Sequence, residues 1–314
     1  MTAACAPGPQ GGQNNEGVHN INTATQETPL LTVKRLLIPL LAHPRVAHTI
    51  KYIVYTGLLF NLGRFIWDDY WAMEAALPPD ASLTDYLTQF ATTIDMLGWV
   101  GLVFLFELET YAVPDEKWTA WLATVIRGFR VICYVMIGQG AYGYAAETLE
   151  LYDQHHIDGL TNICQVADQG RSMQINTFQY VEITSDNCAG LSDGDTFYTV
   201  ANEVAILDVP TLAHVTYQGW IDVANAVVWL IVVLLIEVEI FLQNRDRFST
   251  PILNQVRISK SFFYLVLIGI MFAWLFTGYY LYAWDAFLWI FGFWAIELNL
   301  AEWELDRKEE LRRS

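Results

Sequence analysis

The sequence is poor in charged residues and rich in apolar ones. Asp, Glu, Lys and Arg make up only 16% of the 314 residues, whereas hydrophobic residues make up 54%. Soluble domains usually carry about 25% charged residues, so this composition argues against a soluble globular protein. A helix that crosses a bilayer needs about 20 mostly apolar residues. Six segments of roughly that length predict an all-α integral membrane protein with six transmembrane helices: 49–67, 90–112, 121–146, 217–242, 259–283 and 285–304.

Several groups that would indicate a known chemistry are missing. No His lies inside a predicted span, since His48 falls at the edge of the first, and this argues against haem held by His ligands. No Lys lies in the middle of a span, which excludes a retinal Schiff base. The chain also lacks a Walker A motif, a nucleophile elbow and a His-Glu-x-x-His motif. We therefore expect no enzyme and no nucleic-acid partner, and the one cofactor that the sequence suggests is a bound cation.

The basic residues are unevenly distributed along the chain. Fifteen of the 17 Lys and Arg residues fall in four short stretches, 34–51, 117–130, 245–260 and 307–313. Acidic residues instead dominate 67–88 and 149–216, which contain Arg171 as their one base. Lys and Arg collect on the cytoplasmic side of a membrane. We therefore expect both termini in the cytoplasm, in an inner or plasma membrane, with the acidic segments outside.

The outer segment 149–216 is the one large insertion between predicted spans. It contains Cys164 and Cys188, and outer compartments are oxidising, so we predict a disulfide between them. Alternating apolar residues at 177–184 and 197–207 predict a small β element. Besides the lipid bilayer, we expect a second copy or a membrane-complex partner to contact this insertion. The predicted organisation is a disordered tail 1–28, an interfacial helix 29–47, hairpins 48–113, 114–248 and 249–304, and a tail 305–314.

The predicted helices repeat a pattern of polar residues three times. The second, fourth and sixth predicted spans each have an Asp or Asn, a Trp four residues later, a Glu eight residues after that Trp, and a further polar residue two positions after the Glu. The first, third and fifth predicted spans each have a basic residue followed four residues later by Tyr. This repetition predicts three tandem helical hairpins packed around a pseudo-threefold axis. The repeated residues are Asp95, Trp99, Glu107 and Glu109; Asn225, Trp229, Glu237 and Glu239; Asp285, Trp289, Glu297 and Asn299; and the pairs Lys51–Tyr55, Arg130–Tyr134 and Lys260–Tyr264.

Two interpretations of the repeated Glu residues compete. In the first, Glu107, Glu237 and Glu297 form a carboxylate ring that binds cations, as rings of Asp and Glu do in cation pores. A second layer, formed by Glu109, Glu239 and Asn299, would contain only two carboxylates. In the alternative, these acids form ion pairs with bases of neighbouring hairpins and the protein is a scaffold or accessory subunit, its insertion docking a partner. We expect the repeated Trp residues to pack between helices.

Two further expectations concern single segments. Arg64 lies four residues before Asp68, and this spacing favours an ion pair on the surface of one helix. The alternative is a contact between Arg64 and the Glu layer, by which we mean the repeated Glu residues. The stretch 138–146 is rich in Gly and Ala, which allow close approach of helices in membranes.

Overall fold

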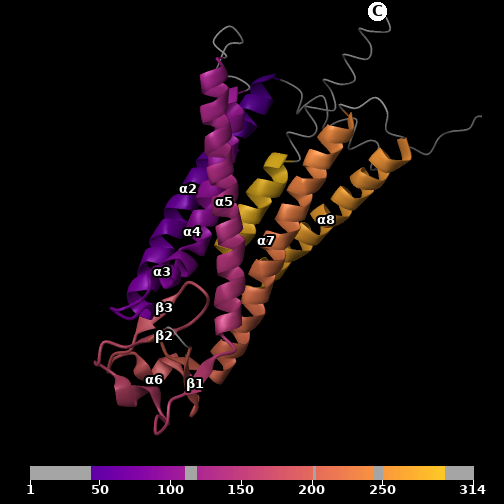
Figure 1. Ribbon diagram of the computed structural model, residues 1–314. Coiled ribbons are helices and arrows are strands. Elements are labelled where there is room, and N and C mark those ends of the chain that lie inside the picture. Colours follow the sequence, from indigo (N-terminus) through magenta and orange to yellow (C-terminus); the bar gives the residue numbers. More distant parts are fainter. Residues whose placement is uncertain (1–43, 110–118, 201–202, 244–249, 294–314) are drawn as a thin grey trace, which may run out of the picture.

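The computed structural model describes residues 44–109, 119–200, 203–243 and 250–293. Its helices lie side by side in a bundle, and a small domain covers one end of that bundle (Figure 1). We call residues 151–208 the small domain, the end of the bundle beside it the small-domain end, and the opposite end the basic end. The helices are α2 (Pro44–Ala76), α3 (Leu83–Gln89), α4 (Ala91–Glu107), α5 (Ala120–Glu150), α7 (Val209–Gln243), α8 (Thr250–Thr277) and a last helix over 280–293.

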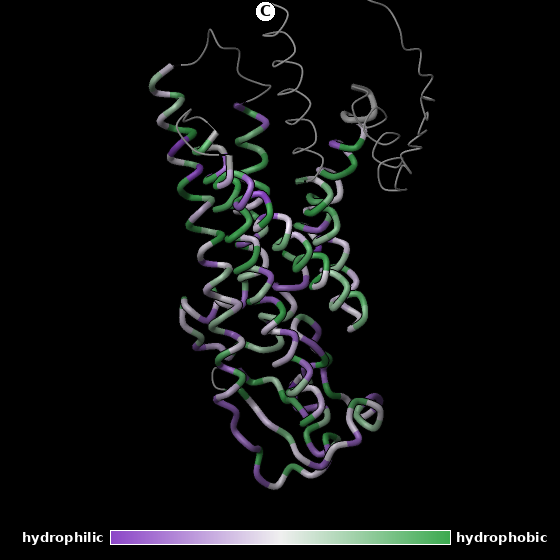
Figure 2. The backbone as a smooth tube through the Cα atoms, turned by 90° about the vertical axis from the view of Figure 1, so that its right-hand side faces the viewer, coloured by the Kyte–Doolittle hydropathy of each residue, from purple (hydrophilic) through white to green (hydrophobic). Residues whose placement is uncertain are grey.

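Three of these helices are long and apolar enough to cross a membrane. They are α5, α7 and α8, and the pair α3 and α4 makes a fourth if a span bent by 65° is counted as one. Figure 2 shows the apolar residues concentrated along the helices and more polar residues in the small domain. The last predicted span, 285–304, lies partly outside the described residues, as does most of the predicted interfacial helix 29–47. The helices therefore support a membrane protein, while six spans and the orientation of the termini stay predictions.

The acidic segment 67–88 differs from the expected loop. Helix α2 continues to Ala76, because no Gly or Pro lies between Gly63 and Pro78 to end it. Helix α3 begins soon after, at Leu83, where the Ser82 hydroxyl accepts a hydrogen bond from the backbone N–H of Asp85. The connecting turn is therefore limited to 77–82. The exposed ion pair Arg64–Asp68 on α2 is confirmed, with a distance of 2.8 Å between Nη2 and Oδ1.

The other two outer connections are also shorter than predicted. The insertion runs from 151 to 208 instead of 149–216, because α7 begins at Val209, where Asp208 accepts a hydrogen bond from the backbone N–H of Thr211. We expected the turn of the third hairpin near 282–285, and this was wrong. The chain turns at Gly278, whose φ of +88° suits glycine, and helix resumes at 280. Asp285 therefore lies inside a helix instead of marking its end.

The small domain consists of short strands and turns held by the predicted disulfide. Its strands form two antiparallel sheets, ordered β1-β4-β5 and β2-β3. The disulfide Cys164–Cys188 is confirmed, with 5.0 Å between the two Cα atoms. Of the two segments predicted to alternate, 177–184 contains β3, and 197–207 contains β4 and the first residue of β5. The elements are β1 (Gln154–His156), η3 (Ile163–Val166), β2 (Ser172–Gln174), β3 (Tyr180–Glu182), α6 (Cys188–Leu191), β4 (Phe197–Val200) and β5 (Leu207–Asp208).

The small domain has its own core and is attached to the bundle. Ile163, Met173, Ile183, Phe197 and Ile206 form that core, all of them 1% exposed or less. The loop between β2 and β3 contacts the bundle, where the ring of Phe178 stacks on Tyr282 with 5.6 Å between centroids. A backbone hydrogen bond from Val204 to Ala76 makes a second attachment. The small domain is therefore fixed over one end of the helices.

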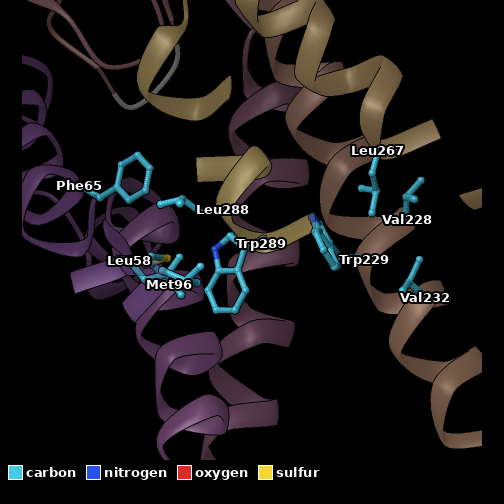
Figure 3. Packing of buried hydrophobic residues seen from close by; sticks show 10 residues of the cluster. Leu58, Phe65, Met96, Val228, Trp229, Val232, Leu267, Leu288 and Trp289 are labelled. Carbon is cyan, nitrogen blue, oxygen red and sulfur yellow. The ribbon is translucent and has the colours of Figure 1, made fainter. Parts of the chain in front are cut away.

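The main core lies in the middle of the bundle and draws on most of its helices. Figure 3 shows Leu58 and Phe65 of α2, Met96 of α4, Val228 and Val232 of α7 and Leu267 of α8 around Trp229, Leu288 and Trp289. Trp229 and Trp289, two of the repeated Trp residues, lie at the centre of this cluster. The expectation that the repeated Trp residues pack between helices is met at both positions.

Helices α4 and α5 approach most closely at glycines of the stretch 138–146. A Cβ atom added to Gly140 would lie 2.5 Å from Asp95 Cβ and 3.1 Å from Asp95 Cα. We expect Gly140→Ala to destabilise the protein by about 1–3 kcal/mol, because the helices must move apart to admit the methyl group. Gly138 is the matched control, since it is exposed, lies two residues earlier on α5 and has open space around it.

Thermal unfolding in detergent, followed by Trp fluorescence, measures both variants. Gly138→Ala should leave the midpoint unchanged or raise it slightly, because Ala favours a helix by about 1 kcal/mol over Gly. Equal midpoints for the two variants would contradict the close packing of α4 on α5 at Asp95.

Candidate functional site

One internal cavity is lined by the first polar residue of each of the three sequence repeats. Asp95 of α4, Asn225 of α7 and Asp285 of the last helix all line it, together with a further acid of α7, Asp222. Its volume is about 60 Å³. Residues from hairpins that are far apart in sequence therefore meet at one place inside the bundle.

Each of the two repeated Asp residues lies close to the Trp of its own helix. Trp99 Nε1 donates to Asp95 Oδ1 at 3.0 Å, and the Trp289 side chain lies near Asp285. Residues four apart lie on one face of a helix, so the Asp-x3-Trp spacing places both side chains toward the axis of the bundle. The carboxylate thus orients the indole ring as well as lining the cavity.

The three repeated Trp rings form a layer beside the cavity. The centroid of Trp99 lies 5.9 Å from that of Trp229 and 5.9 Å from that of Trp289. All three residues also line the cavity, together with Phe293. Distances of this size are typical of packed aromatic rings. We call Trp99, Trp229 and Trp289 the Trp layer; it separates the cavity from the basic end of the helices.

The carboxylates of the cavity have neutral partners. Asp222 accepts from Trp274 Nε1 at 3.1 Å, and Asp285 Oδ1 accepts from Asn61 Nδ2 at 2.7 Å. Tyr144 lies 3.5 Å from Asp95. Within the described residues, no Lys, Arg or His forms an ion pair with these three acids. The cavity therefore holds several acidic groups with no basic group to neutralise them.

The Glu residues at the basic end are arranged differently, because three of the four described ones, Glu107, Glu109 and Glu239, accept hydrogen bonds from basic side chains. Glu107 accepts from Lys51 and from the Tyr55 hydroxyl, the latter at 2.5 Å. Arg130 Nη2 donates to Glu109 at 2.5 Å. The pair Arg130–Glu109 joins neighbouring hairpins, as the second interpretation expects, whereas Lys51 and Glu107 belong to the same predicted hairpin. A carboxylate that already holds a base is a weaker candidate for binding a cation.

Glu239 has two bases. Arg257 Nε lies 2.8 Å from one of its oxygens and Lys260 Nζ lies 2.7 Å from the other. Tyr134 is near enough to Glu237 to interact with it electrostatically. Glu297 and Asn299 lie outside the described residues, so the predicted ring of three Glu stays a prediction.

A second, smaller cavity lies between the first one and the small domain. Its volume is about 20 Å³, and Tyr144 and Asp222 line both cavities. Glu147 of α5 and Glu203 of the small domain add two more carboxylates. Burial, and then repulsion from Glu150, raise the pKa of Glu203 from 4.5 to about 7.

The raised pKa of Glu203 predicts that stability falls with rising pH. Below pH 4.5 the acid is protonated in the folded and the unfolded chain alike, so its full contribution to stability is present. As the pH rises to about 7, the unfolded chain ionises first, and folding loses about 3 kcal/mol. Glu203→Gln should remove this part of the pH dependence, whereas Glu182→Gln, an exposed change in the same domain, should not.

Thermal unfolding between pH 4.5 and 7.5, in a buffer whose only cation is N-methylglucamine, measures the effect. A wild-type profile that matches the Glu203→Gln profile throughout would contradict the assignment.

Sequence reasoning found part of this site. It identified the repeated Asp, Asn and Trp positions but treated them as supporting residues and placed the cation site at the Glu layer. It missed Asp222, Tyr144 and Asn61, which repeat in no other hairpin. The signal for Asp222 was an acid inside an apolar span, three residues before Asn225, where a charge is costly and usually has a function.

Comparisons of the chain with protein-family models, with curated proteins and with solved structures found no match.

Proposed function

We propose that the protein is a cation channel or transporter whose ion site is the cavity lined by Asp95, Asp222 and Asp285. The observation that carries this proposal is the meeting of three carboxylates, from three helices, at one cavity with no base beside them. A charged side chain inside a bilayer costs about 2.5–3.5 kcal/mol on insertion scales. A role in helix packing alone would not offset the free-energy cost of placing three such groups together, whereas a bound cation of the right size would.

The size of the cavity narrows the class of substrate. A single water molecule needs roughly 10–15 Å³ of such space, so about 60 Å³ holds a few waters or a partly hydrated ion. Pockets for drug-sized organic ligands are usually about 300–1,000 Å³. A small inorganic cation or a proton fits the site, and an organic metabolite does not.

The Trp layer bears on how the ion would move. Trp99 packs against both Trp229 and Trp289, and the three rings lie between the cavity and the basic end. An ion that leaves the cavity toward that end would have to pass these rings, so we expect the rings to separate during transport. The hydrogen bond from Trp99 to Asp95 links occupation of the cavity to the position of one ring. A cation bound to Asp95 would compete with the indole N–H for the same carboxylate.

A scaffold or accessory subunit is the second candidate, and the ion pairs at the basic end favour it. Glu109 and Glu239 each pair with a base of the following hairpin, which would join the hairpins without any transport role, while Glu107 pairs with Lys51 of its own hairpin. The two candidates differ in what the cavity does. A scaffold needs no cation there and would move none.

Flux measurements in proteoliposomes separate the two candidates. Purified protein is reconstituted with an indicator for Na⁺, K⁺ or H⁺ inside the vesicles, and a gradient of each ion is imposed in turn. We expect flux of at least one of these cations above that of protein-free vesicles. Absence of flux for all three, in both directions and with a membrane potential of either sign, would exclude the proposal and leave the scaffold.

A further inference from the structure

The second cavity contains polar atoms whose hydrogen-bonding capacity is unused. Gln174, at the end of β2, is 3% exposed, and its Oε1 has no hydrogen-bond partner. Thr177 Oγ1 and Glu203 Oε2 are likewise buried without partners, and all three residues line this cavity. The Tyr180 side chain lies beside Gln174. Buried polar groups are normally satisfied, so a cluster of orphaned oxygens at one cavity points to a bound species that satisfies them.

The chemistry of the lining residues determines which species fits. Amide, hydroxyl and carboxylate oxygens predominate, and Glu147 and Glu203 are close enough to interact electrostatically. Hard oxygen ligands of this kind bind hard cations, and they repel anions. Within the residues that the structure describes, no base pairs with Glu147 or Glu203, so neither carboxyl group is committed to an ion pair.

The size and composition of the cavity indicate a monovalent ion. About 20 Å³ holds one water molecule or one small ion. In the described part of the chain no three His, Cys, Asp or Glu side chains, the acids of the first cavity included, converge closely enough to ligate one metal ion together. Divalent ions usually need more carboxylates, or ligands that complete six or more positions. One alkali ion with few charged ligands is the simplest occupant.

We propose that the small domain and α5 enclose a binding site for one alkali cation, Na⁺ in the first instance, formed by Glu147, Gln174 and Glu203. Because Tyr144 and Asp222 line both cavities, the bound ion lies next to the carboxylate cavity. The site does not depend on translocation, since a chain that moves no ion could still bind one here.

Thermal unfolding of the full-length protein in detergent tests the site. Na⁺, K⁺ and Li⁺ chlorides are titrated against N-methylglucamine chloride at constant ionic strength. We expect a saturable rise of the unfolding midpoint with Na⁺, and a smaller rise or none with the larger K⁺. Glu203→Gln should weaken the apparent affinity by about tenfold or more, because one of two close negative charges is lost. Glu182→Gln, exposed on β3, should leave it unchanged.

Two further variants distinguish this site from the carboxylate cavity. Asp285→Asn changes the first cavity alone, so the Na⁺-dependent rise should survive in it. Gln174→Leu removes an uncharged ligand and should weaken binding even if Glu203→Gln does not fold. No saturable rise with any of the three alkali ions would overturn the inference. A rise that is lost in Asp285→Asn but kept in Glu203→Gln and Gln174→Leu would overturn it too, while leaving the proposed function intact.

Discussion

Replacing Asp285 with Asn is expected to reduce cation flux on the order of a hundredfold, because a unit charge a few ångströms from the ion contributes several kcal/mol at a partly screened site. The variant should fold normally, for a reason contained in the sequence. The second repeat already has Asn at the equivalent position, Asn225. An amide keeps the shape of the carboxylate, and its oxygen can still accept from Asn61. The loss of flux would therefore report the missing charge and not a collapsed cavity.

Two companion variants sharpen this experiment. Asp80→Asn removes the same charge from the exposed turn before α3 and should leave flux unchanged. Asn225→Asp adds a third repeated carboxylate and should bind the cation more tightly, with slower release. Proteoliposome flux, with protein content and unfolding midpoint measured for each sample, provides the comparison. Wild-type flux in Asp285→Asn would remove the carboxylate cavity from the ion path.

The sequence pattern identified residues that line the cavity, but their role in forming a cavity became clear only from the structure. The Asp-x3-Trp spacing recurs in two helices and its Asn variant in a third, so the sequence alone indicated that these positions matter. Which of the repeated acids remain available to an ion depends on which of them form ion pairs with Lys or Arg side chains. Lys51, Arg130 and Lys260 contact the Glu residues, whereas no described base pairs with Asp95 or Asp285. Which acids are paired depends on distances between hairpins, and these distances cannot be derived from hydropathy or from the spacing of residues in the sequence.

Features that occur only once in the chain could not be predicted from the sequence, for a related reason. Asp222 and Tyr144 occur once each, and their role arises because α5 and α7 bring them to the same cavity. The bend of 65° between α3 and α4 is similar, since no Gly or Pro lies beside Phe90 to break the helix. The buried carboxylate of Asp69 accepts from the backbone N–H of Thr93, which stabilises a new helix start at the bend. Both features depend on contacts between segments far apart in the chain.

The described ion pairs at the basic end follow an order along the chain. Arg130 of the second predicted hairpin pairs with Glu109, the last repeated acid of the first. Arg257 and Lys260 of the third predicted hairpin pair with Glu239, the last repeated acid of the second. Lys51 of the first hairpin contacts Glu107 of the same hairpin. By the order of the other two pairs Lys51 would correspond to position 299, an Asn that lies outside the described residues.

Among these ion pairs, Glu239 is expected to contribute most to stability. Its side chain is 11% exposed and that of Lys260 is 12%, so water screens the pair weakly. Glu239→Gln removes the carboxylate that Arg257 and Lys260 share. Breaking a buried ion pair by removing one member costs about 3–5 kcal/mol, and we expect a loss near the lower end because Arg257 is half exposed. Glu109→Gln is the matched control, since Glu109 and Arg130 are 28% and 38% exposed and such pairs contribute about 1 kcal/mol or less.

Thermal unfolding in detergent, combined with a double-mutant cycle, measures this contribution. Lys260→Met in the Glu239→Gln background removes the second charge and should restore part of the lost stability, as expected for two groups that interact. Flux per folded molecule should stay close to that of the wild type in Glu239→Gln, because the ion path proposed here runs through the carboxylate cavity. If Glu239→Gln is as stable as the wild type but loses its flux, the ion site would lie at the Glu layer, and the cavity of Asp95, Asp222 and Asp285 would serve only the packing of the helices.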